Sequence, residues 1–80
     1  MPFVYILRCA DGTLYTGYAV DVEQRCAVHN AGKGARYTAG RRPVTIAYSE
    51  SCATVSEALK REYALKRLTR AEKEALITRG

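Results

Sequence analysis

The chain has 80 residues, of which 48% are hydrophobic, and its formal net charge is +5 at pH 7. This length fills one modest core, so we expect a single domain over residues 1–80, near the lower size limit of independent stability. No run approaches the roughly 18 consecutive apolar residues of a membrane span, and the early apolar run Phe3–Leu7 lacks the charged start and the length of a signal peptide. We therefore expect a cytoplasmic protein without a membrane partner.

An odd number of cysteines, Cys9, Cys26 and Cys52, is spread along the chain. They form no C-x-x-C pair, and a single histidine is present to join them in a metal site. Free thiols in a reducing compartment explain this pattern most simply. We expect neither a disulfide framework nor a zinc site built from cysteine and histidine.

The pattern of hydrophobic residues and breakers predicts three strands. Phe3–Cys9 and Thr13–Ala19 flank Ala10-Asp11-Gly12, which is a hairpin signal. Pro43 leads into a third strand at Val44–Ser49.

The register of the hairpin decides which side chains share a face of the sheet. A two-residue Asp-Gly turn would put Tyr5 and Tyr15 on opposite faces. A three-residue loop with Gly12 in the left-handed conformation pairs Tyr5 with Gly17 and puts both tyrosines on one face, and we favour this register. Gly17 then leaves room for the Tyr5 ring or for a ligand to come close to the backbone.

Capping patterns predict three helices, at about residues 22–31, at about residues 55–67, and from the following Thr almost to the end of the chain. The capping pairs are Asp21 with Gln24, Thr54 with Glu57, and Thr69 with Glu72. The order β-β-α-β-α-α predicts an α+β domain, in which helices cover a three-stranded, largely antiparallel sheet.

A basic stretch runs between Glu23 and Glu50 without an acidic residue. Its cations are Arg25, Lys33, Arg36, Arg41 and Arg42. This stretch is a candidate surface for a polyanion, and an ordinary solvated basic loop is the alternative. Interleaved glycines, with Asn30, Tyr37 and Thr38, favour phosphate contact because small residues expose backbone N–H groups and polar side chains add donors.

Glu62 lies in the middle of the apolar arc of the predicted helix at residues 55–67. At ~100° per residue, Val55, Ala58, Leu59 and Leu65 all lie within roughly 60° of it. A carboxylate in this position either reaches the rim and pairs with Lys66 or is placed to hold a cation.

Several short phrases, in this order and spacing, resemble the GIY-YIG nuclease superfamily. They are Val4-Tyr5-Ile6, Tyr15-Thr16-Gly17, Arg25 with His29 one helical turn later, and Glu62. More narrowly, His29-Asn30, the run from Gly32 to Thr38 and the run from Glu62 to Lys66 are similar to the small stand-alone YhbQ-like proteins of that superfamily. The match spans nearly the whole chain.

The resemblance implies phosphodiester hydrolysis with one metal ion, Mg²⁺ or Mn²⁺, held by Glu62. The implied catalytic residues are Tyr5, Tyr15, Arg25, His29 and Glu62. Tyr5 would be the base or would position the attacking water, with its pKa of about 10 helped by a cation, the metal or His29. His29 would relay the proton, and Arg25 would hold non-bridging phosphate oxygens. Tyr15 and Gly17 would orient the phosphate.

The implied partner is nucleic acid, with DNA favoured over RNA. The residues expected to contact it are Gly17, Lys33, Arg36, Tyr37, Arg41, Arg42 and Lys66. Phe3 stands where the name motif of the superfamily has glycine, and no asparagine follows Glu62. We therefore expect weak or structure-selective cleavage, or cleavage that depends on a protein partner.

Each candidate also has a structural interpretation. Tyr5 and Tyr15 are typical fillers of a sheet face. His29 would favour the helix dipole, and Arg25 would pair with Asp21 at the surface. A non-catalytic nucleic-acid-binding module is therefore the second hypothesis.

Overall fold

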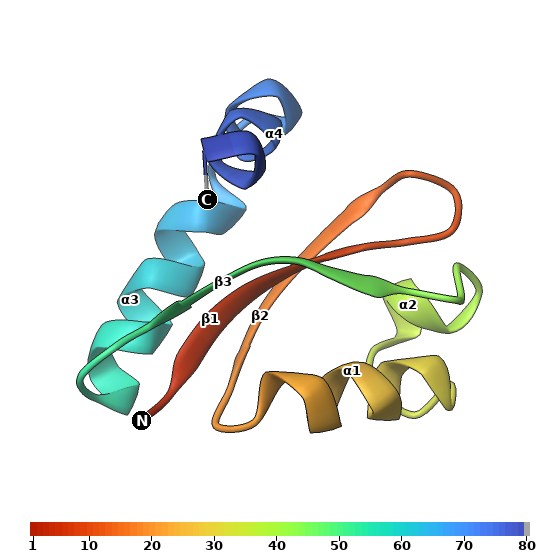
Figure 1. Cartoon of the computed structure of the whole chain (residues 1–80), viewed down its shortest axis with the longest axis horizontal. Helices are drawn as coiled ribbons and strands as arrows, with labels where there is room; N and C mark the ends of the chain where they lie inside the picture. The colour runs from red at the N-terminus through yellow and green to blue at the C-terminus, as the bar shows by residue number, and fades with distance from the viewer. Residues whose placement is uncertain (80) are drawn as a thin grey trace.

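The computed structural model describes residues 1–79, which form a three-stranded sheet and four helices (Figure 1). The strands are β1 (Phe3–Arg8), β2 (Leu14–Ala19) and β3 (Thr45–Ser51), and the helices are α1 (Val22–Asn30), α2 (Arg36–Ala39), α3 (Val55–Lys66) and α4 (Arg70–Arg79). β1 is the central strand and pairs antiparallel with both neighbours. The predicted α+β fold class is confirmed. Among the helices of residues 1–79, none is long and apolar enough to cross a membrane.

The β1–β2 hairpin adopts the three-residue register. Tyr5 pairs with Gly17, and Leu7 pairs with Tyr15. Gly12 has a φ of 86°, a left-handed conformation that glycine adopts without steric cost. Both tyrosines therefore lie on one face of the sheet, as the sequence predicts.

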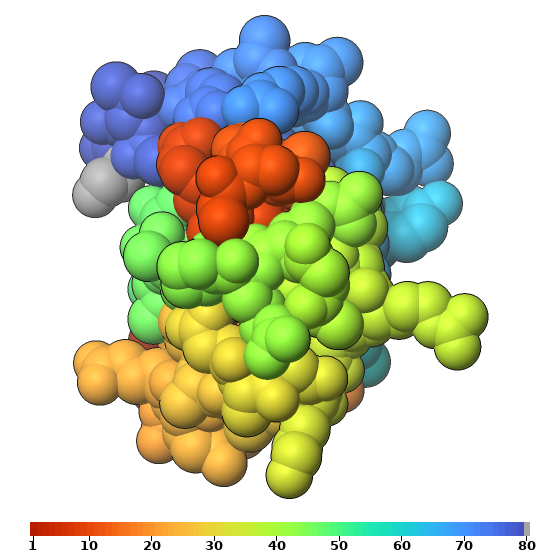
Figure 2. Space-filling view, turned by 90° about the vertical axis from the view of Figure 1, so that its right-hand side faces the viewer, coloured from red at the N-terminus to blue at the C-terminus, as the bar shows by residue number. Residues whose placement is uncertain are grey.

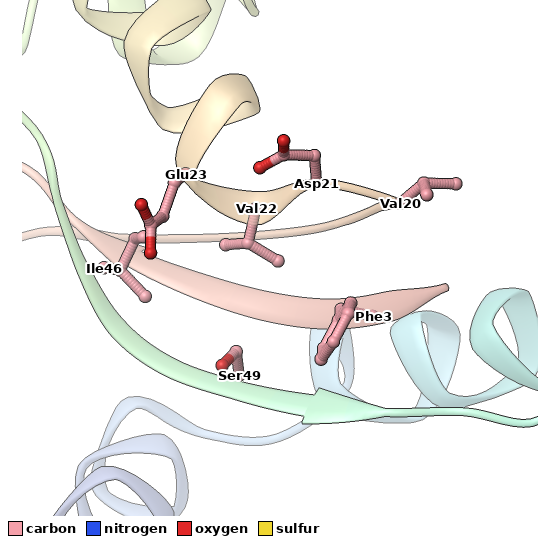
Figure 3. Close-up of a pocket in the computed structure, with 7 residues that line it drawn as sticks. All are labelled: Phe3, Val20, Asp21, Val22, Glu23, Ile46 and Ser49. Carbon is pink, nitrogen blue, oxygen red and sulfur yellow. The ribbon is translucent and has the colours of Figure 1, made fainter. Parts of the chain in front are cut away.

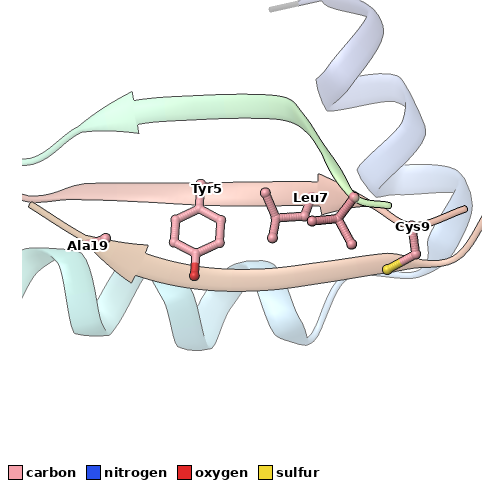
Figure 4. Packing of buried hydrophobic residues seen from close by; sticks show 5 residues of the cluster. Tyr5, Leu7, Cys9 and Ala19 are labelled. Atoms are coloured by element: carbon pink, nitrogen blue, oxygen red, sulfur yellow. The ribbon is translucent and has the colours of Figure 1, made fainter. Parts of the chain in front are cut away.

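The two faces of the sheet carry separate cores. α1 packs through Val22 and Cys26 on one face, and α3 packs through Ala58 and Leu65 on the other. The buried residues of the first core are Tyr5, Leu7, Cys9, Ala19 and Val44 (Figure 4). Because β2 is an edge strand, side chains from both layers can meet along its open side.

The predicted capping residues start α1, α3 and α4. The Asp21 side chain accepts the Gln24 N–H (3.0 Å), which starts α1. Thr69 and Glu72 cap each other reciprocally at the start of α4, at 2.8 and 3.2 Å. α1 and α3 each end one residue earlier than predicted.

The sequence analysis does not predict α2, which forms a single turn inside the glycine-rich basic stretch. The turn is closed by the N–H groups of Thr38 and Ala39, which both donate to the Ala35 carbonyl. The flanking glycines give this stretch the composition of a loop, so the sequence does not indicate a helix this short.

The buried stripe of α3 is narrower than its sequence pattern indicates. Ala58 and Leu65 are fully buried, whereas Val55 and Leu59 are 49% and 45% exposed. Glu62 lies angularly between these two pairs at ~100° per residue. It therefore sits at the boundary of the buried stripe and not at its centre.

The turn of the β1–β2 hairpin lies between α4 and the segment around α2 (Figure 2). A guanidinium N–H of Arg70 donates to the Gly12 carbonyl (2.7 Å). On the other side, Arg41 pairs with Asp11 (3.0 Å). These contacts fix the hairpin turn against both neighbours.

Candidate functional site

Tyr5 is buried on the α1 face of the sheet, where its ring extends from β1 over β2 (Figure 4). A Cβ at Gly17, its partner across the hairpin, would lie 2.6 Å from the Tyr5 hydroxyl oxygen. Since that separation is far inside van der Waals contact, only glycine at this position leaves room for the phenol. The room expected opposite Tyr5 is occupied by its own ring.

His29 lies near the end of α1, buried, with both ring nitrogens in hydrogen bonds. Nε2 lies 3.2 Å from the Tyr5 hydroxyl, and Nδ1 lies 2.8 Å from Oγ1 of Thr38. The Thr38 hydroxyl donates its single proton to the Ala35 carbonyl (3.1 Å), so it accepts from Nδ1–H. Nε2 is then the acceptor, and the Tyr5 hydroxyl donates to it.

The protonation states agree with these bond directions. Burial, followed by the charge of Arg25, lowers the pKa of His29 below its usual 6.5. Burial and the neighbouring Tyr15 raise the pKa of Tyr5 to about 12, although Arg25 pulls it down. Burial outweighs the nearby cation, so Arg25 alone does not lower the pKa of Tyr5 in the free protein. A protonated phenol faces a neutral imidazole.

Arg25 and Glu62 approach this phenol from different helices. Arg25 lies one turn before His29 on α1, exposed, and its positive charge lowers the pKa of Tyr5. Glu62 lies on α3, on the other face of the sheet, and its negative charge raises the same pKa. Its side chain is only 18% exposed and also pairs with Lys66 (3.4 Å).

Tyr15 completes the group around His29. Its ring is tilted against the imidazole with centroids 5.2 Å apart, and it contacts Tyr37 of α2 at 5.8 Å. Tyr5, Tyr15 and His29 are therefore in contact, and the charges of Arg25 and Glu62 act on the Tyr5 phenol.

The sequence profile of the GIY-YIG catalytic domain matches residues 1–75. The chain belongs to the GIY-YIG family. Among its relatives, the UPF0213 protein VNG_2274C of Halobacterium salinarum is 58% identical over 77 residues, which cover 96% of this chain and 100% of the relative. The UPF0213 protein SERP0126 of Staphylococcus epidermidis is 58% identical over 78 residues, which cover 98% and 95%.

Solved structures have the same fold as this GIY-YIG chain. The solution NMR structure of the UPF0213 protein BH0048 from Bacillus halodurans has a TM-score of 0.61 at 44% identity, covering 98% of this chain and 84% of that one. The solution NMR structure of the protein EF2693 from E. faecalis has a TM-score of 0.63 at 46% identity, covering 95% and 81%.

One carboxylate, Glu62, is available to a divalent ion beside Tyr5. No group of three or more His, Cys, Asp or Glu side chains lies together anywhere in residues 1–79. Magnesium commonly keeps several waters and takes one or two protein carboxylates with substrate phosphate. A partly exposed single carboxylate at the site fits that mode, and it does not fit a metal cage built from protein ligands alone.

The basic residues expected to bind nucleic acid divide into two groups. Lys33 and Arg36 are exposed on the loop before α2 and at its start. Arg41 donates to the Tyr37 carbonyl (2.7 Å) and lies over its ring, and Arg42 donates to the carbonyls of Ala39 and Asn30. The second group thus also holds the loop together.

The sequence analysis grouped Thr38 and Gly34 with phosphate contact and did not predict that they shape the site around His29. Thr38 orients His29, and Gly34 leaves space for the imidazole. Asn30, expected near phosphate, instead clamps the backbone of Val44: its amide accepts the Val44 N–H (2.7 Å) and donates to the Val44 carbonyl (3.0 Å). Thr38 and Gly34 both lie in the run from Gly32 to Thr38, and the resemblance of that run to the YhbQ-like proteins was the signal that could have identified them.

A hollow of about 560 Å³ lies elsewhere, between the start of α1 and β3 (Figure 3). Phe3, Val22 and Ile46 line it, together with the carboxylates of Asp21 and Glu23. It contains none of the five candidate residues, and its negative charge would repel phosphate. The group of side chains around Tyr5 and His29 is the candidate site.

Proposed function

We propose that this GIY-YIG chain is a divalent-metal-dependent endonuclease that hydrolyses phosphodiester bonds in DNA, with weak or structure-selective cleavage. Membership of the GIY-YIG family supports a nuclease in general. The observation that carries the proposal is the Tyr5 hydroxyl, which donates to a neutral His29 while Arg25 and Glu62 lie near it.

In this proposal Tyr5 and His29 pass on the proton of the attacking water. With a pKa of about 12, the phenol does not act as a preformed phenolate at neutral pH. The Tyr5 oxygen accepts the proton of the water while its own proton moves to Nε2 of His29. Thr38 keeps Nδ1–H occupied, so Nε2 remains the only ring nitrogen free to accept.

The planar, permanently charged guanidinium of Arg25 would donate hydrogen bonds to the non-bridging oxygens of the phosphate. Tyr15, packed on His29, borders the position of the phosphate. Glu62 would hold Mg²⁺ or Mn²⁺, which when bound polarises the phosphate and stabilises the leaving oxygen. Lys33, Arg36 and Lys66 would add phosphate contacts around the site.

We further propose that the chain acts in the cytoplasm as one domain. All three cysteines are free thiols in the structure, which supports a reducing compartment.

The decisive experiment incubates labelled single-stranded, duplex, flapped and branched DNA with the protein, in Mg²⁺, in Mn²⁺ and in EDTA. Arg25→Ala and Glu62→Gln should abolish metal-dependent cleavage, whereas Lys60→Gln, on an exposed part of α3, should cleave as wild type does. If wild type binds these substrates and leaves all of them intact with either metal, the endonuclease is rejected in favour of a non-catalytic nucleic-acid-binding module.

A further inference from the structure

A second pocket, of about 200 Å³, lies where α4 meets the hairpin and α2. Its lining residues are Thr13, Leu14, Tyr37, Arg70 and Lys73. Figure 2 shows this side of the molecule, with the hairpin turn between α4 and the segment around α2. None of these residues belongs to the group around Tyr5, and only Tyr37 was expected to contact nucleic acid.

The pocket carries positive charge that the chain neutralises only in part, because Arg70 pairs with Glu74 (3.5 Å). Arg70 is fixed at the rim by its hydrogen bond to the Gly12 carbonyl (2.7 Å). The Lys73 ammonium, half-buried on the next turn of α4, makes no hydrogen bond or ion pair within residues 1–79. Burial and the nearby Lys66 lower the pKa of Lys73.

The carboxylates near the pocket are already engaged. Glu74 binds Arg8 through two hydrogen bonds (2.7 and 2.9 Å) and pairs with Arg70 (3.5 Å), and it makes no contact with the Lys73 ammonium within residues 1–79. Asp11 binds Thr13 and Arg41 on the hairpin side. An anion from outside the chain is therefore the natural partner of Lys73.

The pocket is continuous with the site around Tyr5. Tyr37 lines the pocket and contacts Tyr15, which packs on His29. Lys66, which pairs with Glu62, is also the cation whose charge reaches Lys73. A strand that has one phosphate beside Tyr5 and runs along Tyr15 and Tyr37 passes over this pocket.

We propose that this pocket binds a backbone phosphate of the nucleic-acid strand on one side of the cut, with Lys73 and Arg70 as its ligands. Leu14 and the Tyr37 ring offer an apolar wall to the adjoining sugar. The proposal rests on the proposed function, because the strand is placed by the site around Tyr5. The test of this site measures nucleic-acid binding and does not require cleavage.

The test measures the affinity of a labelled flapped DNA over a series of salt concentrations, in EDTA so that no cleavage occurs. Log K falls as log[salt] rises, and each lost phosphate contact lowers the steepness of this slope by about 0.9 for duplex or 0.7 for single strands. Lys73→Gln should lower it by about that amount, and Lys73→Met, which keeps the aliphatic stem, should do the same. Lys73→Arg should keep the wild-type slope.

Lys60→Gln is the matched control, since it removes the same charge from an exposed part of α3. Thermal melting of each variant shows whether the fold is retained. If the slope is unchanged in both Lys73→Gln and Lys73→Met, the proposed phosphate site is rejected. It is also rejected if Lys60→Gln lowers the slope equally. Neither result contradicts the proposed endonuclease. Lowered slopes in the Lys73 variants, together with no cleavage by wild type in Mg²⁺ or in Mn²⁺, keep the pocket and reject the endonuclease. No binding by wild type rejects both.

Discussion

Gly34 and His29 approach each other so closely that a Cβ at Gly34 would lie 2.2 Å from Nδ1 of the imidazole. The imidazole has no room to move aside, because Tyr5 and Thr38 hold its two nitrogens. The backbone before α2 therefore forms a wall that sets the position of His29.

Gly34→Ala should consequently destabilise the protein by about 1–3 kcal/mol, the usual range for overpacking a filled interior. Urea unfolding gives the change in the free energy of unfolding. Gly40→Ala is the matched control, because a Cβ at Gly40 meets no atom within 4 Å. Equal stability of the two variants would show that the loop before α2 yields easily and does not fix His29.

Tyr5→Phe tests whether the buried phenol transfers a proton. Removal of the hydroxyl breaks the path to His29, and we expect cleavage to slow by about 10²–10⁴, the range typical of general acid–base catalysis. DNA binding should change little, because the lost group carries no charge. Tyr18→Phe is the control, because Tyr18 is exposed and lies on the opposite face of the sheet from Tyr5. Wild-type cleavage by Tyr5→Phe would leave the phenol a packing role only.

The pH dependence of stability follows from His29. Its pKa in the folded protein lies below the 6.5 of the unfolded chain, so the unfolded chain binds the proton more strongly. The contribution of His29 is complete above pH 6.5 and is lost as the pH falls through the lower folded pKa. Urea unfolding at several pH values between about 5 and 7.5 should show this loss, and His29→Gln should lack it. An identical acid slope in the variant would assign the effect to carboxylates.

The pH dependence of cleavage follows from the same imidazole. Protonated His29 cannot accept from Tyr5, so the rate should fall on the acid side, below pH 6.5. Because the pKa of Tyr5 is about 12, its ionisation should cause no change in rate up to about pH 10. Single-turnover rates across this range test both statements. A rate that rises with an apparent pKa near that of free phenol would indicate a phenolate base.

The parts of this site that sequence predicts depend on local rules. The pairing of Tyr5 with Gly17 follows from strand alternation and the length of the turn, and the start of α1 follows from Asp21. The contact of His29 with Thr38 depends on a turn too short to show in composition. Burial, which the local sequence does not display, raises the pKa of Tyr5 although the charge of Arg25 lowers it.

A substitution at Asn30 distinguishes a structural role of this residue from a contact with nucleic acid. Asn30→Ala removes two hydrogen bonds to the Val44 backbone, and at about 0.5–1.5 kcal/mol each the free energy of unfolding should fall by about 1–3 kcal/mol. DNA affinity of the folded variant should equal that of wild type. A loss of affinity with unchanged stability would return Asn30 to the nucleic-acid surface.

Thr38 acts on the proposed chemistry through His29 alone, so it is a positioning residue. Thr38→Val keeps the shape of the side chain but removes the acceptor for Nδ1–H, which leaves the imidazole free to place its proton on Nε2. In that tautomer Nε2 no longer accepts from Tyr5, and we expect kcat to fall with KM nearly unchanged. Thr38→Ser restores the hydroxyl and should restore kcat, which separates tautomer control from packing. If Thr38→Ser is as slow as Thr38→Val, the methyl group matters and the hydrogen bond does not.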